Sequence, residues 1–576
     1  MEFKELTNYL LKLEDTSKRL EMIDILSEVF SKTKQDEINA TVNFIQEQLL
    51  PPFYGIQLGI ADKMVEKVIA LAYDKDLKSV SEDYKRIGDL GEVAEKNSKK
   101  EKTSNLKVKE VYERLYKIAE ISGEGSVEDK INMLSDLLKE VSQKDAKFVV
   151  RFVMGKLRLG VGEATIMEAL SKAKTGSRDF KKEIEKAFNL CSDLGYTAEI
   201  LYSKGEEGIK KFHISAMKPI RPALAERLSS PKEILDKMGR CAVDQKLDGF
   251  RAQVHKKGSE VRVFSRNLED ITHFMPEIVN EIKKIEATEL IIDGEALTYD
   301  ENTGTLYPFQ ITIQRKRKHN IEAVSQQLPL KLFVFDIMLF NKKSLIDEPY
   351  IERRKIIDEL FAGTKTIAKT NMIITDKESE IERFFDSTLE SGLEGIVAKR
   401  LNSPYSAGAR NFNWIKMKRS YKSKLDDTVD IVILGYFKGK GQRAQFGLGA
   451  VLAGVYDDKE DIFRSLTKVG SGFSEEQFKQ LYKILEEIKV DNKPARTDSI
   501  MKPDVWVIPK YVITVKADEI TRSPTHTAGM KDGIGFALRF PRAVSFIRSD
   551  KRAEDSNTVK DIIEMYNEQK NIKVSG

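Results

Sequence analysis

The sequence has few of the residues from which disulfide or soft-metal scaffolds are built. Among 576 residues there are two cysteines, Cys191 and Cys241, and five histidines that fall in no metal-ligand spacing. Two thiols exclude a disulfide framework and, with the scattered histidines, a structural zinc site. Any metal ion that this protein uses should therefore be held by oxygen ligands.

Long apolar runs are also missing from the sequence. The stretch from Met1 to Leu20 is charged and amphipathic, and no later run approaches the ~20 apolar residues that a membrane-spanning helix needs. We therefore expect a cytoplasmic protein. An excess of one charge is lacking as well, because 96 basic and 91 acidic residues leave a formal charge of +5. That total alone does not establish a nucleic-acid partner.

The chain is too long for one ordinary domain of roughly 100–200 residues, and the spacing of its apolar residues changes twice along it. From Met1 to about Lys211 apolar residues recur at intervals of three and four, which predicts helices. After 216–228 short apolar runs alternate with helical stretches, which indicates an α+β domain. After Lys424 short strands alternate with glycine-rich turns and one helical stretch, which is typical of a small barrel of the OB type. The predicted domains are residues 1–215, 216–420 and 421–576.

The most informative stretch is VDQKLDGF, in which Lys246 is followed by Leu247, Asp248 and Gly249. Taken alone, this lysine is compatible with a β-turn on a charged surface. Five further segments place a charged or aromatic side chain among apolar strand residues: SRNLED (265–270), DGEAL (293–297), FVFDIM (333–338), LEGIVAKR (393–400) and NWIKMKR (413–419). Because charges are costly to desolvate, such side chains on buried strands indicate a pocket.

This ordered series, beginning with K-x-D-G at 246–249, resembles the nucleotidyltransferase superfamily of DNA ligases, RNA ligases and mRNA capping enzymes. Over nearly the whole chain the resemblance is closest to ATP-dependent DNA ligases of the archaeal and eukaryotic type. It implies a multidomain fold with an all-α DNA-binding domain, an α+β nucleotidyltransferase domain of ATP-grasp-like adenylation type, and a β-barrel OB-fold domain. It also implies an enzyme that seals nicks in duplex DNA through lysyl-AMP and DNA-adenylate intermediates, in replication, repair and recombination.

The resemblance assigns the catalytic role to Lys246, which would form a phosphoamide with AMP taken from ATP. The other matched positions surround the nucleotide: Asp244 would contact adenine, Phe335 would stack on it, Glu295 would accept from the ribose, Arg251 would lie near sugar and phosphate, and Arg266, Arg410, Lys416 and Lys418 would bind phosphate. Relatives often have glutamate where this chain has Asp244, so the carboxylate here is carried on a shorter side chain. For Phe335 the alternative is an ordinary core ring.

A metal site is implied by the same resemblance. Glu394, together with Glu295, would bind Mg²⁺, for which Mn²⁺ could substitute, in keeping with the preference of these ions for oxygen ligands. The alternative for Glu394 is a salt bridge to Lys399 or Arg400.

The proposed nucleophile must lose a proton before it reacts. A lysine amine attacks phosphorus only when neutral, whereas its reference pKa is ~10.4. Desolvation and neighbouring cations lower such a pKa. We therefore expect burial and the charges of Lys416 and Lys418 to lower the pKa of Lys246.

The two ends of the chain carry further matched basic residues. In ALRFPRAVSFIRSDKRAED the candidates for closing over the ATP pyrophosphate are Arg539, Arg542 and Lys551, which predicts at least two domain arrangements. In the helical third, glycines at helix starts allow close backbone approach to phosphate, and the candidates for DNA contact are Arg151, Lys156 and Arg158. The alternative reading of this region is helix capping and packing.

Several alternatives stay open at this point. Archaeal relatives commonly carry a sliding-clamp peptide of the form Gln-x-x-apolar-x-x-aromatic-aromatic, but 99–109 contains neither its glutamine nor its aromatic pair. Clamp binding through that segment is therefore not expected. An RNA ligase or a GTP-using capping enzyme would not be expected to have the helical third. A DNA-binding scaffold with an inactive centre would require loss of Lys246, Glu394 or the paired lysines. Encirclement of DNA favours a monomer.

Overall fold

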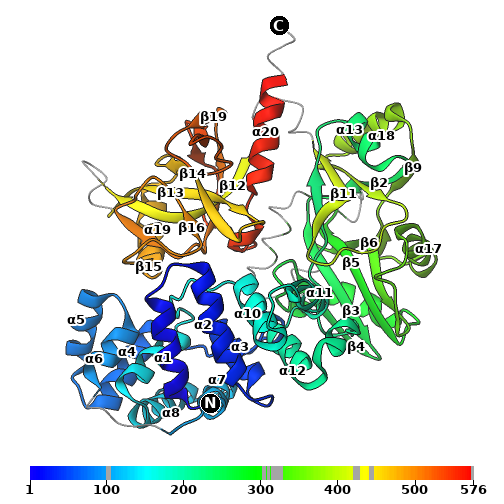
Figure 1. The fold of residues 1–576 in the computed structure, drawn as a ribbon. Coiled ribbons are helices and arrows are strands. Elements are labelled where there is room, and N and C mark those ends of the chain that lie inside the picture. Colours follow the sequence, from blue (N-terminus) through cyan, green and yellow to red (C-terminus); the bar gives the residue numbers. More distant parts are fainter. Residues whose placement is uncertain are drawn as a thin grey trace.

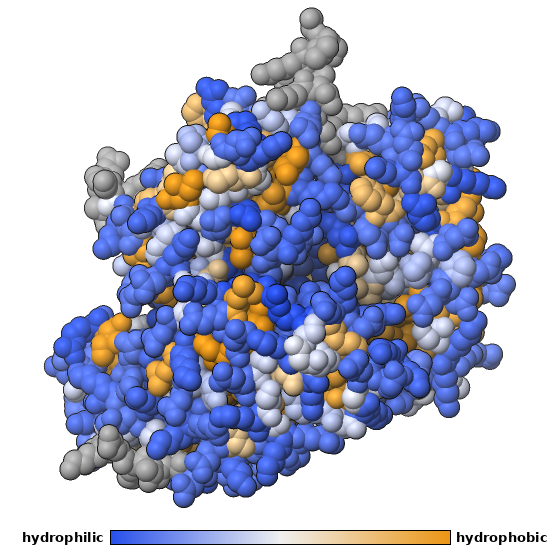
Figure 2. Space-filling view, viewed as in Figure 1, coloured by the Kyte–Doolittle hydropathy of each residue, from blue (hydrophilic) through white to orange (hydrophobic). Residues whose placement is uncertain are grey.

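The computed structural model describes residues 1–98, 105–300, 306–307, 312, 315, 328–418, 428–439 and 447–571. Three regions lie around a common centre, and Figure 1 shows the helical region below, the green sheets on the right and the yellow and orange strands at the upper left. Hydrophilic side chains dominate the face drawn in Figure 2. Within the described ranges, no helix has both the length and the apolar character needed to cross a bilayer.

The first region consists of helices alone, as the apolar spacing predicts. Its elements are α1 (Phe3–Glu14), α2 (Arg19–Lys32), α3 (Ile38–Ile45), η1 (Pro52–Tyr54), α4 (Asp62–Tyr73), α5 (Leu77–Ile87), α6 (Leu90–Asn97), α7 (Val108–Glu120), α8 (Ser126–Glu140), α9 (Gln143–Val153), α10 (Glu163–Thr175), α11 (Lys181–Cys191) and α12 (Leu194–Lys210). The apolar faces form one core, in which the rings of Phe44 and Phe152 stack with centroids 4.4 Å apart. Side-chain caps set several helix starts; Ser142, for example, accepts from the backbone of Asp145 at the start of α9.

The middle region is built on two sheets. Its elements are β1 (Leu224–Arg227), α13 (Pro231–Met238), β2 (Cys241–Lys246), β3 (Phe250–Lys257), β4 (Glu260–Ser265), η2 (Thr272–Phe274), α14 (Pro276–Lys284), β5 (Glu289–Thr298), β6 (Leu330–Phe340), β7 (Lys343–Ser344), α17 (Tyr350–Leu360), β8 (Ile367–Lys369), β9 (Met372–Thr375), α18 (Glu378–Glu390), β10 (Gly395–Arg400) and β11 (Arg410–Lys418). One sheet has the order β1-β11-β10-β2-β9, and the other has β4-β3-β5-β6-β7 with β8 beside β6.

The third region is mainly β-structure. Its elements are β12 (Thr428–Lys438), β13 (Leu448–Asp457), β14 (Ile462–Val469), α19 (Glu475–Glu486), β15 (Lys489–Val490), β16 (Thr497–Asp498), β17 (Val505–Val507), β18 (Val512–Lys516), β19 (Glu519–Ser523), β20 (Gly535–Arg539), β21 (Arg542–Ala543), η5 (Ala553–Asp555) and α20 (Val559–Asn571). Eight of these strands form one sheet, and β19 and β20 form a separate hairpin.

The sequence predicts one helix in this third region, and the structure has a second, α20. Thr558 and Asp561 exchange backbone and side-chain hydrogen bonds at its start. Ile562 and Met565 are buried in the core of the third region, while Lys560 pairs with Glu226 of the middle region at 2.7 Å. Helix α20, red in Figure 1, therefore links the third region to the middle one.

Candidate active site

Strand register brings together three residues that are far apart in the sequence. Strand β10 lies between β2 and β11, and its first residue, Gly395, is paired with Lys246 on one side and Lys418 on the other. Glu394 precedes this strand, and its carboxylate accepts a hydrogen bond from the Nζ of each lysine. Gly395 has φ of 148°, and a Cβ there would lie 2.1 Å from the carbonyl oxygen of Met417. Only glycine therefore permits this close approach.

The electrostatics of this cluster differ from the expectation for Lys246. Burial alone would raise the pKa of Glu394, but the charges and hydrogen bonds of Lys246 and Lys418 outweigh it and lower the pKa to about 2. For Lys246, burial favours the neutral amine, but the charge and hydrogen bond of Glu394 outweigh burial, helped by Glu295 and Asp248, and raise the pKa. The expectation of a lowered pKa is thus wrong for this arrangement, because the nearest groups are carboxylates rather than cations.

Lys416, unlike Lys246, has a lowered pKa. It lies opposite Val397 in the pairing of β10 with β11. Burial, together with the nearby charge of Arg410, lowers its pKa to about 7, while Asp561 acts in the opposite direction. Lys416 therefore gains or loses its charge near neutral pH.

Glu295 and Arg251 lie side by side on the neighbouring sheet. They are register partners on β5 and β3. Burial raises the pKa of Glu295 to about 7, although the charges of Lys246 and Arg251 oppose the shift. The guanidinium of Arg251 donates to both oxygens of Asp293, at 3.1 and 2.6 Å, and to the carbonyl of Ala223. Arg251 is thus held against the sheet by a buried carboxylate.

Two aromatic rings, one from each sheet, pack against each other. Phe335 of β6 meets Trp414 of β11 edge to face, with centroids 5.9 Å apart. Phe335 is half-buried and Trp414 is 6% exposed. Lys399 donates to the carbonyl of Phe335 at 3.0 Å, and its Nζ lies 4.9 Å from the Phe335 ring centre. The half-buried ring is compatible with stacking on a base.

Asp244 is the anchor of a buried polar network. It is 1% exposed, and its two oxygens accept from Tyr350 and Thr370 at 2.8 Å each, while Arg354 and Lys399 lie within ion-pair distance. A contact with adenine would require one of these partners to release the carboxylate. From its sequence position Lys399 was expected only as an alternative partner of Glu394, and Tyr350 and Arg354 lie in no motif that identifies them.

Three family models match successive parts of the chain. They are described as "DNA ligase N terminus", over residues 2–171, "ATP dependent DNA ligase domain", over 222–418, and "ATP dependent DNA ligase C terminal region", over 444–551. "Probable DNA ligase" of Dictyoglomus turgidum is 48% identical over 100% of this chain and 99% of its own length. The chain belongs to the ATP-dependent DNA ligase family.

Other relatives match the same full length. "Probable DNA ligase" of Dictyoglomus thermophilum is 49% identical, over 100% of this chain and 99% of its own length. "DNA ligase" of Saccharolobus solfataricus is 41% identical, over 100% of this chain and 98% of its own length. The similarity therefore includes the helical, middle and third regions of the ligase alike.

The third region of the ligase approaches the active site through a loop that the sequence analysis named only in part. Asn267 donates to the carbonyl of Ser549 at 3.0 Å, which joins the 265–268 turn to the 548–551 loop. The charge of Arg548 acts on Asp248, two residues after the lysine. Lys551, which was named, pairs with Asp430. Arg548 was missed because the stretch contains several arginines and its sequence does not indicate which one faces the site.

The other arginines that were predicted to bind phosphate or pyrophosphate have different surroundings in the structure. Arg539 is 56% exposed and pairs with Glu519 at 2.5 Å within its own hairpin. Arg542 lies on the short β21, opposite Lys516. Arg410 pairs with Asp561 of α20 at 3.1 Å, and the charge of Arg266 acts on Asp555 of the third region. In this arrangement Arg410 and Arg266 therefore face the third region.

The three basic residues of the helical region do not behave alike. Arg151 is 3% exposed and pairs with Asp89 at 2.8 Å and with Glu14 at 2.9 Å, so in this arrangement it supports packing, which was the alternative reading. Lys156 and Arg158 both contact the third region of the ligase, and Arg158 also lies 3.4 Å from the Asp89 carboxylate of its own region. Direct contact with a ligand is thus possible for these two only if that region moves.

Proposed function

We propose that this protein seals nicks in duplex DNA, with Lys246 as the residue that carries AMP. The observation that carries the proposal is the convergence of Lys246, Glu394 and Lys418 at one end of the sheet. In the first step the Nζ of Lys246 forms a bond to the α-phosphorus of ATP, and the bond to pyrophosphate breaks. AMP then passes to the 5′-phosphate of the nick, and the 3′-hydroxyl finally displaces AMP as the phosphodiester forms.

The residues around the lysine suit a bound nucleotide. The ring of Phe335 offers a face for adenine, and Glu295 would accept from a ribose hydroxyl. Lys416 and Lys418, on the same strand as each other, would hold the α-phosphate and offset the charge that develops on it. Both oxygens of Glu394 now accept from lysines, so Lys246 can lose its proton readily only when Glu394 is engaged elsewhere.

A magnesium ion fits the acidic residues of this site. Among the residues that the structure describes, no group of three or more His, Cys, Asp or Glu is arranged to hold a metal ion. Mg²⁺ in nucleotide enzymes is commonly bound by one or two carboxylates together with phosphate oxygens and water. Glu394 and Glu295, whose charges act on one another, supply such carboxylates. When bound, the ion would stabilise negative charge on the phosphates.

The domain roles follow the same proposal. Residues 1–215 would bind duplex DNA, 216–420 would carry the adenylation chemistry, and 421–576 would form an OB-type barrel that closes over ATP and later moves aside. As a monomer, the protein would then encircle the duplex and read backbone and shape, because a nick can occur in any sequence. A role in replication, repair and recombination, and a cytoplasmic, nucleoid-associated location, belong to this proposal. Of the clamp-peptide segment, residues 99–104 lie outside the described residues.

One assay tests the proposed function. The protein is incubated with Mg²⁺ and α-labelled ATP or GTP, denatured, and examined for bound label; nicked or intact duplex is then added to undenatured protein. We expect label from ATP, its release by nicked DNA, and joined strands as the product. Label from GTP alone, or release by RNA but not by nicked DNA, would instead favour a capping enzyme or an RNA ligase.

Lys416 gives the nucleotide-binding step a pH dependence. Its pKa of about 7 means that it loses its charge as pH rises through neutrality. Affinity for ATP should therefore fall by roughly tenfold as pH rises from about 7 toward the higher pKa that Lys416 acquires beside phosphate. Calorimetry with an ATP analogue that cannot be cleaved at the α-phosphate measures this. Lys416→Arg keeps its charge and should flatten the profile, whereas a flat profile for the unmodified protein would contradict the assignment.

A further inference from the structure

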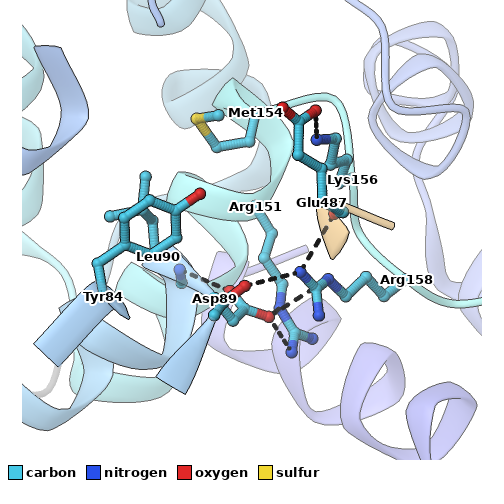
Figure 3. Close-up of a pocket in the computed structure, with 10 residues that line it drawn as sticks. Tyr84, Asp89, Leu90, Arg151, Met154, Lys156, Arg158 and Glu487 are labelled. Atoms are coloured by element: carbon cyan, nitrogen blue, oxygen red, sulfur yellow. Dashed lines mark hydrogen bonds and ion pairs between the residues drawn. The ribbon is translucent and has the colours of Figure 1, made fainter. Parts of the chain in front are cut away.

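The third region covers two basic residues of the helical region. The Nζ of Lys156 lies 2.9 Å from a carboxylate oxygen of Glu487, just after α19. Arg158 donates to the carbonyl of Lys489 at 3.1 Å and to the carbonyl of Glu487 at 3.4 Å. Figure 3 shows the Arg158 guanidinium between Asp89 and Glu487, with Lys156 beside the Glu487 carboxylate.

The shape of the basic loop comes from the helical region itself. Arg158 and Gly160 have positive φ values of 62° and 66°, so the chain turns sharply after α9. The side chain of Glu47 accepts from the backbone N–H of Leu157 at 2.7 Å and holds this turn. Arg151 of α9 forms an ion pair with Asp89 at 2.8 Å. The contact with the third region is thus added to a turn that is already formed, and its loss would leave the loop in place.

The Glu487 carboxylate offers Lys156 anionic oxygens like those of a DNA phosphate. Arg158 lies 3.4 Å from the Asp89 carboxylate of its own region and donates across the contact to two neutral backbone carbonyls, an acceptor position that a phosphate oxygen would also fill. A carboxylate and a phosphate both present anionic oxygens, to which lysine and arginine donate charge-assisted hydrogen bonds. Glu487 is 44% exposed at its side chain, and such ion pairs contribute little stability. A DNA backbone, which presents several phosphates to one surface, can therefore displace this contact.

We propose that the 487–489 segment occupies a phosphate position on the helical region, so that nicked DNA and the third region compete for Lys156 and Arg158. The inference rests on the proposed DNA-binding function. While the 487–489 segment holds Lys156 and Arg158, the 548–551 loop of the same region stays beside the active site, where Asn267 donates to Ser549. The first step with ATP can therefore proceed, whereas DNA binding requires release. The contact thereby favours adenylation before DNA is bound.

A disulfide across the contact tests the inference directly. A Cβ built at Gly160 lies 3.9 Å from the Cβ of Ala495, within the ~3.5–4.5 Å that disulfides span. The native Cys191 and Cys241 are buried and free, so they do not compete for the engineered pair. In Gly160→Cys/Ala495→Cys, oxidised protein should take label from ATP at the rate of the reduced protein but bind nicked DNA at least roughly tenfold more weakly.

The reduced form of the same protein is the reference, because it carries the same strain at Gly160. Reduction should restore DNA binding and nick sealing. Equal DNA binding by the oxidised and reduced forms would overturn the competition. Failure of unmodified protein to seal nicks would instead refute the proposed function, so the two failures can be distinguished.

A single substitution tests the competing charge without any added strain. Glu487→Gln removes the carboxylate and should tighten binding of nicked DNA by roughly two- to fivefold, as expected for loss of an exposed ion pair. Glu475→Gln, at an exposed position on the preceding helix, is the matched control and should leave binding unchanged. Unchanged or weaker binding by Glu487→Gln would contradict the inference, whatever the disulfide variant does.

Discussion

Replacing Lys246 by alanine should reduce transfer of label from ATP to the protein by about 10³-fold or more, to background. The reason is covalent: no other amine can form the bond to phosphorus at this position. Lys418, the nearest lysine in the cluster, already donates to Glu394 from another strand. The measurement is retention of label after denaturation, followed over time with excess ATP.

Two controls separate lost chemistry from lost folding. Lys257→Ala removes an exposed lysine at the end of the following strand and should label normally. The thermal unfolding midpoint of Lys246→Ala should stay close to that of the unmodified protein, because Glu394 is 26% exposed at its side chain and still accepts from Lys418. Retained labelling by a folded Lys246→Ala protein would refute the mechanism proposed for this ligase.

Replacing Glu394 by alanine should slow labelling by roughly 10²- to 10³-fold while leaving the fold intact. Two lysines lose their shared acceptor, and the proposed metal loses a ligand. Glu390→Ala, at an exposed position at the end of α18, should label normally and serves as the control. Labelling at the unmodified rate by Glu394→Ala would remove Glu394 from the mechanism.

The pH profile distinguishes a chemical role for Glu394 from a purely structural one. Glu394 raises the pKa of Lys246, so the fraction of neutral amine in the unmodified protein increases with pH up to that raised value. In Glu394→Gln the pKa of Lys246 should fall, and residual labelling should therefore level off at a lower pH. A profile of unchanged shape would indicate that the carboxylate does not control the proton of Lys246.

The nature of the three regions was predictable because it depends on local patterns. Apolar spacing in 1–211 reports helices, and short runs after 216–228 report strands, since each is a property of neighbouring residues. Helix α20 was not predicted, although Val559, Ile562, Ile563 and Tyr566 recur at intervals of three and four. Its place beside the third region depends on packing against a core built from distant strands.

The roles of individual charged residues were less predictable, because each has several possible ion-pair partners in the sequence. Arg151 carries the charge expected of a DNA-binding residue, yet Asp89 and Glu14 enclose it. Arg539 and Arg548 lie in one basic stretch, and only the path of the chain brings the second near Asp248. The sequence contains the charges, but which of them come together is decided by residues that can be hundreds of positions apart, as Asp248 and Arg548 are.

What the sequence by itself determined is the chemistry that the chain can offer: a lysine in K-x-D-G, a carboxylate in LEGIVAKR, and a lysine pair near the end of the middle region. The tertiary structure decided how they meet. Because β10 is paired between β2 and β11, Glu394 lies between Lys246 and Lys418, and it raises the pKa that the sequence led us to expect would fall. Side-chain type is local, whereas the sign of a pKa shift depends on which charges folding places within a few ångströms.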